Sequence, residues 1–276
     1  MHRLLAMVTV GVLVASLAVP TAALASTRPI EYLAVGDSLA FGYNPLVSPA
    51  DADNYVGYPD FVAESVGDAL TNAACPGETS GHFIDLIAPD RGCGFFRSLF
   101  PLHAAYVGTQ MAFADALLAD HPKTRLVTID IGANDVSNLK DSCGGQPSCV
   151  LAGLPTVLAT VSANLDTIYR HLRTVDGYHH KLVALMIYST DYADPTLTGV
   201  VASLNSVVAA RTLAWGGIVA DGFGAWASAA APYGGDTCAA GLRIVTSRSP
   251  LTCDDHPAAL GHRLLAQAIV QALQAD

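Results

Sequence analysis

Charged side chains are scarce in this chain. Only 14% of its 276 residues are Asp, Glu, Lys or Arg, whereas 51% are hydrophobic. Disordered proteins have the opposite balance, because they carry too little apolar surface to form a core. Positive charge is the scarcer kind, with 14 Lys and Arg against 24 Asp and Glu and a formal net charge of −10 at pH 7. We therefore expect a folded protein that binds neither nucleic acid nor anionic membranes.

A long and almost wholly apolar run, Leu4–Val19, lies near the N-terminus behind the basic residue Arg3. It is shorter than a membrane-spanning helix needs to be, and the small-x-small sequence Ala23–Ala25 follows it as a cleavage site would. We therefore expect 1–25 to be a signal peptide and the protein to be secreted, with a retained membrane anchor as the alternative. Residues 26–276 lack a Pro/Ser-rich linker and are expected to form a single domain, a monomer without stable membrane insertion.

Cysteine is also rare, but all six residues fall in the expected secreted part. An even number of cysteines in an oxidising compartment indicates three disulfide bonds, for which 15 pairings are possible. Sequence order favours bonds between neighbours, namely Cys75–Cys93, Cys143–Cys149 and Cys238–Cys253. A metal site is the weaker interpretation, because the chain has no Cys-x-x-Cys pair and no histidine placed to complete a zinc ligand set.

Short apolar runs alternate with longer helical patterns. Strands are expected at Ile30–Val35, Ala69–Ala73, Leu126–Ile131, Leu182–Ile187 and Ile218–Ala220. Helices are expected at Pro59–Val66, Gln110–Asp120, Leu154–Arg173, Leu197–Ala214 and Pro257–Gln274, with both prolines in first turns. The alternation predicts an α/β fold, a three-layer α/β/α sandwich around a doubly wound parallel sheet. Two long loops, 76–108 and 141–153, interrupt it, and long loops in compact domains are commonly functional or disordered.

Four polar clusters lie at predicted strand ends or before a predicted helix. They are Gly36–Ser38, Asn72–Thr79, Gly132–Asp135 and Cys253–His256. Because the carboxyl ends of parallel strands meet at one edge of a sheet, we expect all four clusters to lie there together.

The clusters carry complementary chemistry. Ser38 needs a base to become a nucleophile, and His256 can serve as one near neutral pH. Attack on an ester creates a negative oxygen that needs preorganised donors. The backbone N–H groups of Ser38 and Gly77 and the side-chain amide of Asn134 are candidates for that role. Glycine at position 77 lets the backbone approach the substrate closely.

In this order and at these spacings, the four clusters resemble the sequence blocks of the SGNH, or GDSL-type, hydrolases over nearly the whole chain after residue 25. The resemblance implies Ser38 as nucleophile, His256 as base, and Gly77 and Asn134 as oxyanion donors. It also implies a flavodoxin-like sheet and a secreted esterase or lipase that needs neither a metal nor an organic cofactor. The implied partner is an ester substrate: a lipid, a short acyl ester or an acylated glycan.

The sequence departs from the family pattern next to the base. The family usually has Asp three residues before the histidine, where this chain has Cys253. Asp254 stands two residues before His256 and is a candidate for the missing acid if the loop is reshaped. A backbone carbonyl near Cys253 is the alternative. We favour the carbonyl, because Asp254 would be poorly aimed at the imidazole on the family's usual loop path.

Other histidines and aromatic residues have competing interpretations. His103 and His262 are alternative bases, but His262 lies within a helical pattern and is expected to pack or to face solvent there. His82 is expected to be an ordinary polar residue. The loop aromatics could line an acyl pocket or pack beneath the loops; they are Tyr43, Tyr58, Tyr106, Phe95 and Phe96.

Other functions compete with ester hydrolysis. An α/β-hydrolase would need Gly-x-Ser-x-Gly in mid-chain, whereas Ser38 follows the first strand and residue 40 is alanine. A nucleotide or flavin binder would need Gly-x-Gly-x-x-Gly or a following lysine, and the segment 36–42 has neither. A non-catalytic secreted binding protein on the same fold and an acyltransferase using the same residues stay as alternatives.

Overall fold

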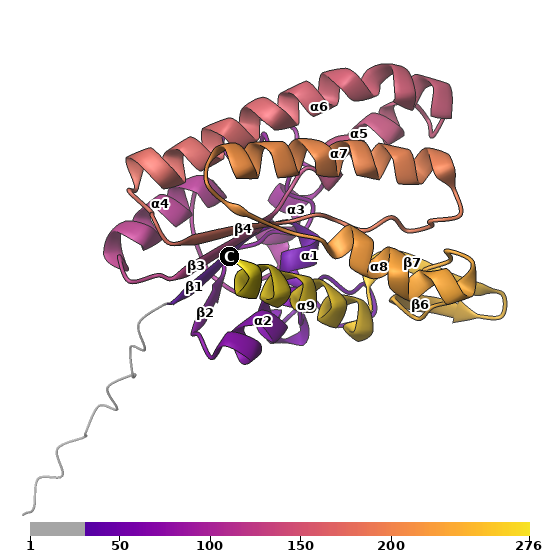
Figure 1. The fold of residues 1–276 in the computed structure, drawn as a ribbon, viewed down its shortest axis with the longest axis horizontal. Helices are drawn as coiled ribbons and strands as arrows, with labels where there is room; N and C mark the ends of the chain where they lie inside the picture. Colours follow the sequence, from indigo (N-terminus) through magenta and orange to yellow (C-terminus); the bar gives the residue numbers. More distant parts are fainter. Residues whose placement is uncertain (1–30) are drawn as a thin grey trace, which may run out of the picture.

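The computed structural model describes residues 31–276, so the expected signal peptide lies outside the described residues. Five parallel strands form the main sheet in the order β2-β1-β3-β4-β5 (Figure 1). They are β1 (Tyr32–Gly36), β2 (Leu70–Asn72), β3 (Leu126–Asp130), β4 (Lys181–Leu185) and β5 (Ile218–Ala220). This order is flavodoxin-like and places a topological switch point beside β1. The expected strands are confirmed within the described residues, with ends shifted by one or two residues.

Helices cover both faces of the sheet, which confirms the expected three-layer sandwich (Figure 1). One face packs against α4 (Gln110–Asp120), α6 (Pro147–Arg170) and α7 (Pro195–Ala214), and the other against α2 (Tyr58–Val66), α8 (Gly222–Ala230) and α9 (Ala259–Ala275). Four α-helices lie in segments where the sequence analysis expected no helix: α1 (Ser38–Phe41), α3 (Cys93–Leu99), α5 (Ala133–Ser142) and α8.

The two cores follow from the alternation of side chains along each buried strand. In β1, Leu33 and Val35 enter one core, whereas Tyr32 and Ala34 enter the other. All four are at most 1% exposed. Continuous apolar runs are therefore required in these strands, because both faces are covered by helices.

Two expectations about the helices are wrong. The segment 141–153 is not a long loop, because α5 and α6 occupy most of it. Pro147 stands in the first turn of α6, where a missing N–H does no harm. Pro155 lies inside that helix, and because proline commonly breaks helices, the sequence did not indicate that the helix begins before it. Pro257 does not begin the last helix: it ends strand β7 (Leu251–Pro257), and α9 starts two residues later.

Strand β7 pairs with β6 (Arg243–Arg248) in an antiparallel hairpin outside the main sheet, which the sequence analysis did not predict. A disulfide ties the hairpin to the segment before it. The three expected pairings are confirmed, with Cα atoms 5.5 Å apart in Cys75–Cys93, 5.6 Å in Cys143–Cys149 and 5.8 Å in Cys238–Cys253.

Two stretches, Pro147–Val175 and Pro195–Ala214, are long and apolar enough to cross a membrane by length and composition alone. Core helices of soluble proteins pass the same test. Here both stretches pack on the sheet, where Leu165 of α6 and Leu204 of α7 belong to one of its cores.

Candidate active site

The carboxyl end of β1 forms a tight turn, Gly36–Ser38, called here the nucleophile turn. Gly36 has a φ of 140°, and a Cβ atom there would lie 2.3 Å from the backbone oxygen of Asp130, so the position requires glycine. Asp37 caps helix α1 by accepting a hydrogen bond from Leu39 N at 3.0 Å. Ser38 is the first residue of α1, and its backbone N–H therefore has no acceptor within the helix.

The hairpin brings a histidine to this serine. His256 Nε2 lies 2.9 Å from Ser38 Oγ, and His256 Nδ1 lies 2.5 Å from Asp254 Oδ1. Asp254 Oδ1 also accepts a hydrogen bond from the backbone N–H of His256 at 2.9 Å. The hydrogen bond with the His256 side chain lowers the pKa of Asp254, against the opposing effect of burial. Hydrogen bonds thus connect the Asp254 carboxylate through the His256 ring to the Ser38 hydroxyl.

This geometry contradicts the expectation that a backbone carbonyl orients His256. The residues before the histidine form strand β7 and not a loop on the family's usual path. The strand is irregular at this point, because Arg243 pairs with Pro257 and Val245 with Cys253, which leaves extra residues in β7. There the Asp254 carboxylate contacts both the backbone N–H and the ring of His256, so the acid can stand two residues before the histidine.

Arg243 of β6 holds the backbone around Asp254. Its guanidinium donates to the carbonyl oxygens of Asp254 at 2.9 Å and Cys253 at 3.1 Å, and to Asp255 Oδ1 at 2.7 Å. Tyr188 OH donates to the carbonyl oxygen of Asp255 at 2.7 Å. The sequence analysis missed both residues, because neither belongs to a polar cluster. For Tyr188, its position shortly after β4 was the available signal.

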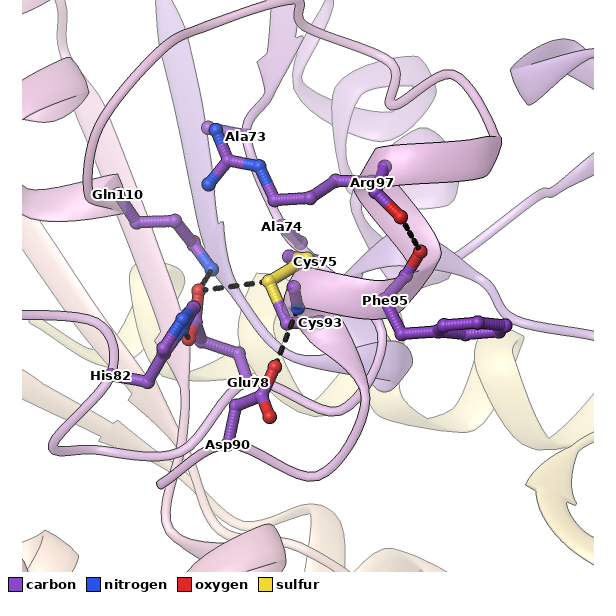
Figure 2. Close-up of a disulfide and its surroundings, with 12 residues drawn as sticks. Ala73, Ala74, Cys75, Glu78, His82, Asp90, Cys93, Phe95, Arg97 and Gln110 are labelled. Atoms are coloured by element: carbon purple, nitrogen blue, oxygen red, sulfur yellow. Dashed lines mark hydrogen bonds and ion pairs between the residues drawn. A yellow bond between two sulfur atoms is a disulfide. The ribbon is translucent and has the colours of Figure 1, made fainter. Parts of the chain in front are cut away.

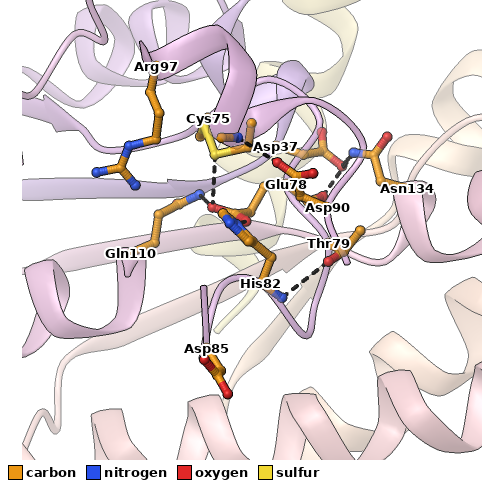
Figure 3. Close-up of polar contacts among 12 residues, drawn as sticks. Asp37, Cys75, Glu78, Thr79, His82, Asp85, Asp90, Arg97, Gln110 and Asn134 are labelled. Carbon is orange, nitrogen blue, oxygen red and sulfur yellow. Dashed lines mark hydrogen bonds and ion pairs between the residues drawn. A yellow bond between two sulfur atoms is a disulfide. The ribbon is translucent and has the colours of Figure 1, made fainter. Parts of the chain in front are cut away.

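The segment after β2, Cys75–Glu78, is called here the oxyanion loop. Gly77 has a φ of 83°, and a Cβ atom there would lie 2.3 Å from a backbone oxygen, so glycine is required. Asn134, near the start of α5, donates from Nδ2 to the carbonyl oxygen of Glu78 at 2.9 Å and to Asp37 Oδ2 at 3.2 Å (Figure 3). Asn134 therefore bridges the oxyanion loop and the nucleophile turn. The structure brings together all of the predicted site residues.

Two further carboxyl groups stabilise this arrangement. Asp130, the last residue of β3, accepts a hydrogen bond from Tyr58 OH at 2.6 Å, and Asp135 accepts from both the backbone N and Oγ of Ser80 at 2.9 and 2.7 Å. Burial raises the pKa of Asp130, Asp37 and Asp135. These groups fix the backbone around the site.

The other histidines lie away from the serine hydroxyl. His262 is buried in α9, and its Nδ1 has no hydrogen-bond partner among the described residues, which agrees with a packing role. His103 Nε2 lies 3.0 Å from the carbonyl oxygen of Phe41. His82 is not an ordinary polar residue, because it is 5% exposed and pairs with the carboxylate of Glu78.

The loop aromatics divide between the site and the core. The ring of Tyr43 lies 4.9 Å from that of His256 and packs edge-on against Phe96. Tyr58 is fully buried, Tyr106 is half-buried, and Phe95 is 69% exposed. Of these loop aromatics, Tyr43 is therefore the one that contacts the ring of His256.

One group of potential metal ligands occurs within residues 31–276, formed by Cys75, Glu78 and Cys93 with ligand atoms within 4.8 Å of one another. Both sulfur atoms belong to the disulfide, so they are not available as thiolate ligands. This group does not form a thiolate metal site.

A model described as the GDSL-like Lipase/Acylhydrolase family matches residues 34–264, a range that contains all four polar clusters. The chain belongs to this family. A search of curated protein sequences found no match.

Solved structures share the fold of this GDSL-type chain at low sequence identity. An extracellular lipase from Streptomyces rimosus is 19% identical with a TM-score of 0.59, covering 87% of this chain and 98% of its own. Phospholipase A1 from Streptomyces albidoflavus is 18% identical with a TM-score of 0.56 and the same coverage. An acetylxylan esterase from Geobacillus stearothermophilus is 16% identical with a TM-score of 0.53, covering 89% of this chain and 96% of its own.

Proposed function

We propose that the protein is a secreted serine esterase or lipase that hydrolyses carboxylic esters through Ser38 and His256. The observation that carries the proposal is the hydrogen-bonded series from Asp254 through His256 to Ser38, with distances of 2.5 and 2.9 Å. A serine becomes nucleophilic when a histidine takes its proton and a third group orients that histidine. Membership of a lipase and acylhydrolase family supports the same chemistry.

In the first half-reaction, Ser38 Oγ forms a bond to the ester carbonyl carbon while its proton moves to His256 Nε2. Asp254 stabilises the resulting imidazolium. The carbonyl π electrons move to the oxygen, which accepts hydrogen bonds from the backbone N–H groups of Ser38 and Gly77 and from the Asn134 amide. Asn134 can redirect the longer of its two bonds, that to Asp37 at 3.2 Å.

The tetrahedral intermediate then collapses. The bond from carbon to the alcohol oxygen breaks, and the alcohol leaves with the proton of His256, so that Ser38 carries the acyl group. In the second half-reaction a water molecule loses a proton to His256 Nε2 and attacks the acyl carbon. The carboxylic acid departs, and the Ser38 oxygen takes the proton back.

The test uses the secreted protein with a series of p-nitrophenyl esters of increasing acyl length and a fluorophosphonate probe. We expect Ser38→Ala to abolish hydrolysis and labelling, because it removes the nucleophile, while Ser65→Ala on the exposed face of α2 keeps both. The adduct should map to Ser38. Folded wild-type protein without an adduct would favour the binding protein, and transfer of the acyl group to an added alcohol would favour the acyltransferase.

The ring of Tyr43 beside His256 supports an ester with an apolar acyl chain.

Secretion rests on the predicted signal peptide and agrees with the three disulfide bonds, which persist in oxidising compartments. N-terminal sequencing of protein from the culture medium should begin after Ala25. Retention of 1–25 in a cell-bound protein would show a membrane anchor instead.

A further inference from the structure

The side chain of Gln110, at the start of α4, pairs with the backbone of the nucleophile turn. Its Oε1 accepts a hydrogen bond from Gly36 N at 3.0 Å, and its Nε2 donates to Gly36 O at 2.8 Å. Gly36 is two residues from Ser38, so this paired contact holds the backbone that carries the nucleophile. Gln110 is 0% exposed, and water therefore cannot replace these bonds.

The same amide reaches the oxyanion loop. Gln110 Nε2 also donates to Glu78 Oε2 at 2.7 Å, as Figure 3 shows between the two side chains. An amide has two N–H donors, and here one serves Gly36 and the other serves Glu78. The side-chain amide of Gln110 therefore joins two loops that follow different strands.

The carboxylate of Glu78 is fixed on its other sides. Its Oε1 pairs with His82 Nδ1, and this hydrogen bond raises the pKa of His82. Its Oε2 lies 3.5 Å from the sulfur of Cys93, whose disulfide with Cys75 packs against it (Figure 2). Glu78 is 1% exposed, so a charged group is held by a small set of partners.

The backbone of the same residue meets the oxyanion donor, because Glu78 O accepts a hydrogen bond from Asn134 Nδ2 at 2.9 Å. These hydrogen bonds form a closed network. Gln110 bonds to Gly36 and to the Glu78 side chain, while Asn134 bonds to the Glu78 carbonyl and to Asp37 beside Gly36. We propose that Gln110 is a positioning residue that sets the distance between the nucleophile and the oxyanion donors. The inference rests on the proposed ester hydrolysis and names a residue outside the family's four blocks.

A primary amide of this length suits the role for a chemical reason. The site needs one acceptor for Gly36 N and two donors, for Gly36 O and for Glu78. A glutamate at position 110 would supply no donor and would face the carboxylate of Glu78. An asparagine would keep the amide but is one methylene shorter, so it could not reach both loops.

The experiment compares Gln110→Glu, Gln110→Asn, Glu78→Gln and the exchange variant Gln110→Glu with Glu78→Gln. For each, kcat and KM are measured on one soluble ester, with active sites counted by fluorophosphonate titration and stability by thermal unfolding. Gln267→Glu, exposed on α9, is the matched control for the chemical change. Leu172→Ala, a core change near the start of β4, controls for lost stability alone.

Gln110→Glu and Gln110→Asn should lower kcat per titrated site on the order of 10²-fold, because catalytic groups misplaced by about 1 Å lose that much, with KM changed little. The exchange variant restores a donor and an acceptor between positions 78 and 110 but leaves Gly36 O without its donor. It should therefore recover only the part of the loss in kcat that Gln110→Glu causes through Glu78. Gln110→Asn should lower kcat far less in an Asn134→Ala background than in the wild type, because both changes act on one oxyanion site. Leu172→Ala should lower stability and leave kcat per site unchanged.

The outcomes separate the two proposals. If wild-type protein hydrolyses esters and labels at Ser38, but Gln110→Asn keeps its kcat per site and only melts earlier, then Gln110 is structural and the inference fails alone. Equal losses in the wild-type and Asn134→Ala backgrounds would overturn it too. Absence of hydrolysis and labelling in the wild type would overturn both proposals. Should Gln110→Glu not fold, Gln110→Asn in the wild-type and Asn134→Ala backgrounds decides.

Discussion

At the scale of single residues, Asp254 and Asp255 are neighbours in β7 with different surroundings. The Asp254 carboxylate contacts His256 and has a lowered pKa, whereas the Asp255 side chain is 75% exposed and contacts Arg243. Hydrogen bonds to the backbone and ring of His256 hold the Asp254 carboxylate, whereas Arg243 holds that of Asp255. These partners distinguish the two acids.

We therefore expect Asp254→Asn to reduce kcat by about 10⁴-fold, the loss seen when a triad acid can no longer hold the histidine in its working tautomer. Asp255→Asn is the matched control, because it makes the same chemical change one residue away, and it should cost less than about tenfold. Steady-state kinetics on one soluble ester compare the two variants. A loss below tenfold in Asp254→Asn would restore the backbone carbonyl as the group that orients His256.

At the scale of elements, the hairpin β6–β7 carries Asp254 and His256. Arg243 of β6 and the Cys238–Cys253 disulfide both hold the β7 backbone beside these two residues. Arg243 has 13% of its side chain exposed, and its guanidinium donates to the carbonyl oxygens of two successive residues, Cys253 and Asp254. Losing a partner of a half-buried carbonyl costs about 1–3 kcal/mol. The hairpin therefore depends on this side chain for the position of the base.

Arg243→Met keeps the length and the apolar stem but removes the hydrogen bonds to the strand. We expect kcat to fall on the order of 10-fold to 10²-fold through a less well positioned His256, without loss of the main sheet. Arg248→Met, at the exposed end of the same strand, should have little effect. Kinetics combined with far-ultraviolet circular dichroism test this, and unchanged kcat in Arg243→Met would show that Arg243 is not needed to position His256.

The elements also show how far sequence could predict this structure. The main sheet was predictable, because strands covered on both faces are continuous apolar runs such as Tyr32–Val35 in β1. The hairpin was not, since β7 is largely polar and only partly buried. Local motifs revealed four of the site residues: Ser38, Gly77, Asn134 and His256. No local pattern reveals Gln110 and Arg243, because their hydrogen-bond partners lie 74 and 11 residues away in sequence.

At the scale of the whole molecule, two buried histidines respond to pH in opposite ways. Hydrogen bonding to Glu78 raises the pKa of His82, so its contribution to stability is present below about pH 6.5 and is lost as pH rises through its folded pKa. Burial lowers the pKa of His262 to about 3. The unfolded chain then binds a proton at His262 that the folded protein does not, so stability falls as pH drops below about 6.5.

We expect His262→Met to remove the loss of stability that His262 causes at low pH, because methionine fills a similar space without a titrating group. Between pH 7.5 and pH 5 the wild type should lose roughly 2 kcal/mol of unfolding free energy through His262 alone, and the variant should lack that part of the loss. Urea unfolding at several pH values measures both curves, and groups that titrate alike in the two proteins cancel in their difference. His179→Met, at an exposed position, is the control and should follow the wild type. Parallel curves for wild type and His262→Met would mean that His262 takes up its proton alike in the folded and unfolded protein, so that burial does not lower its pKa.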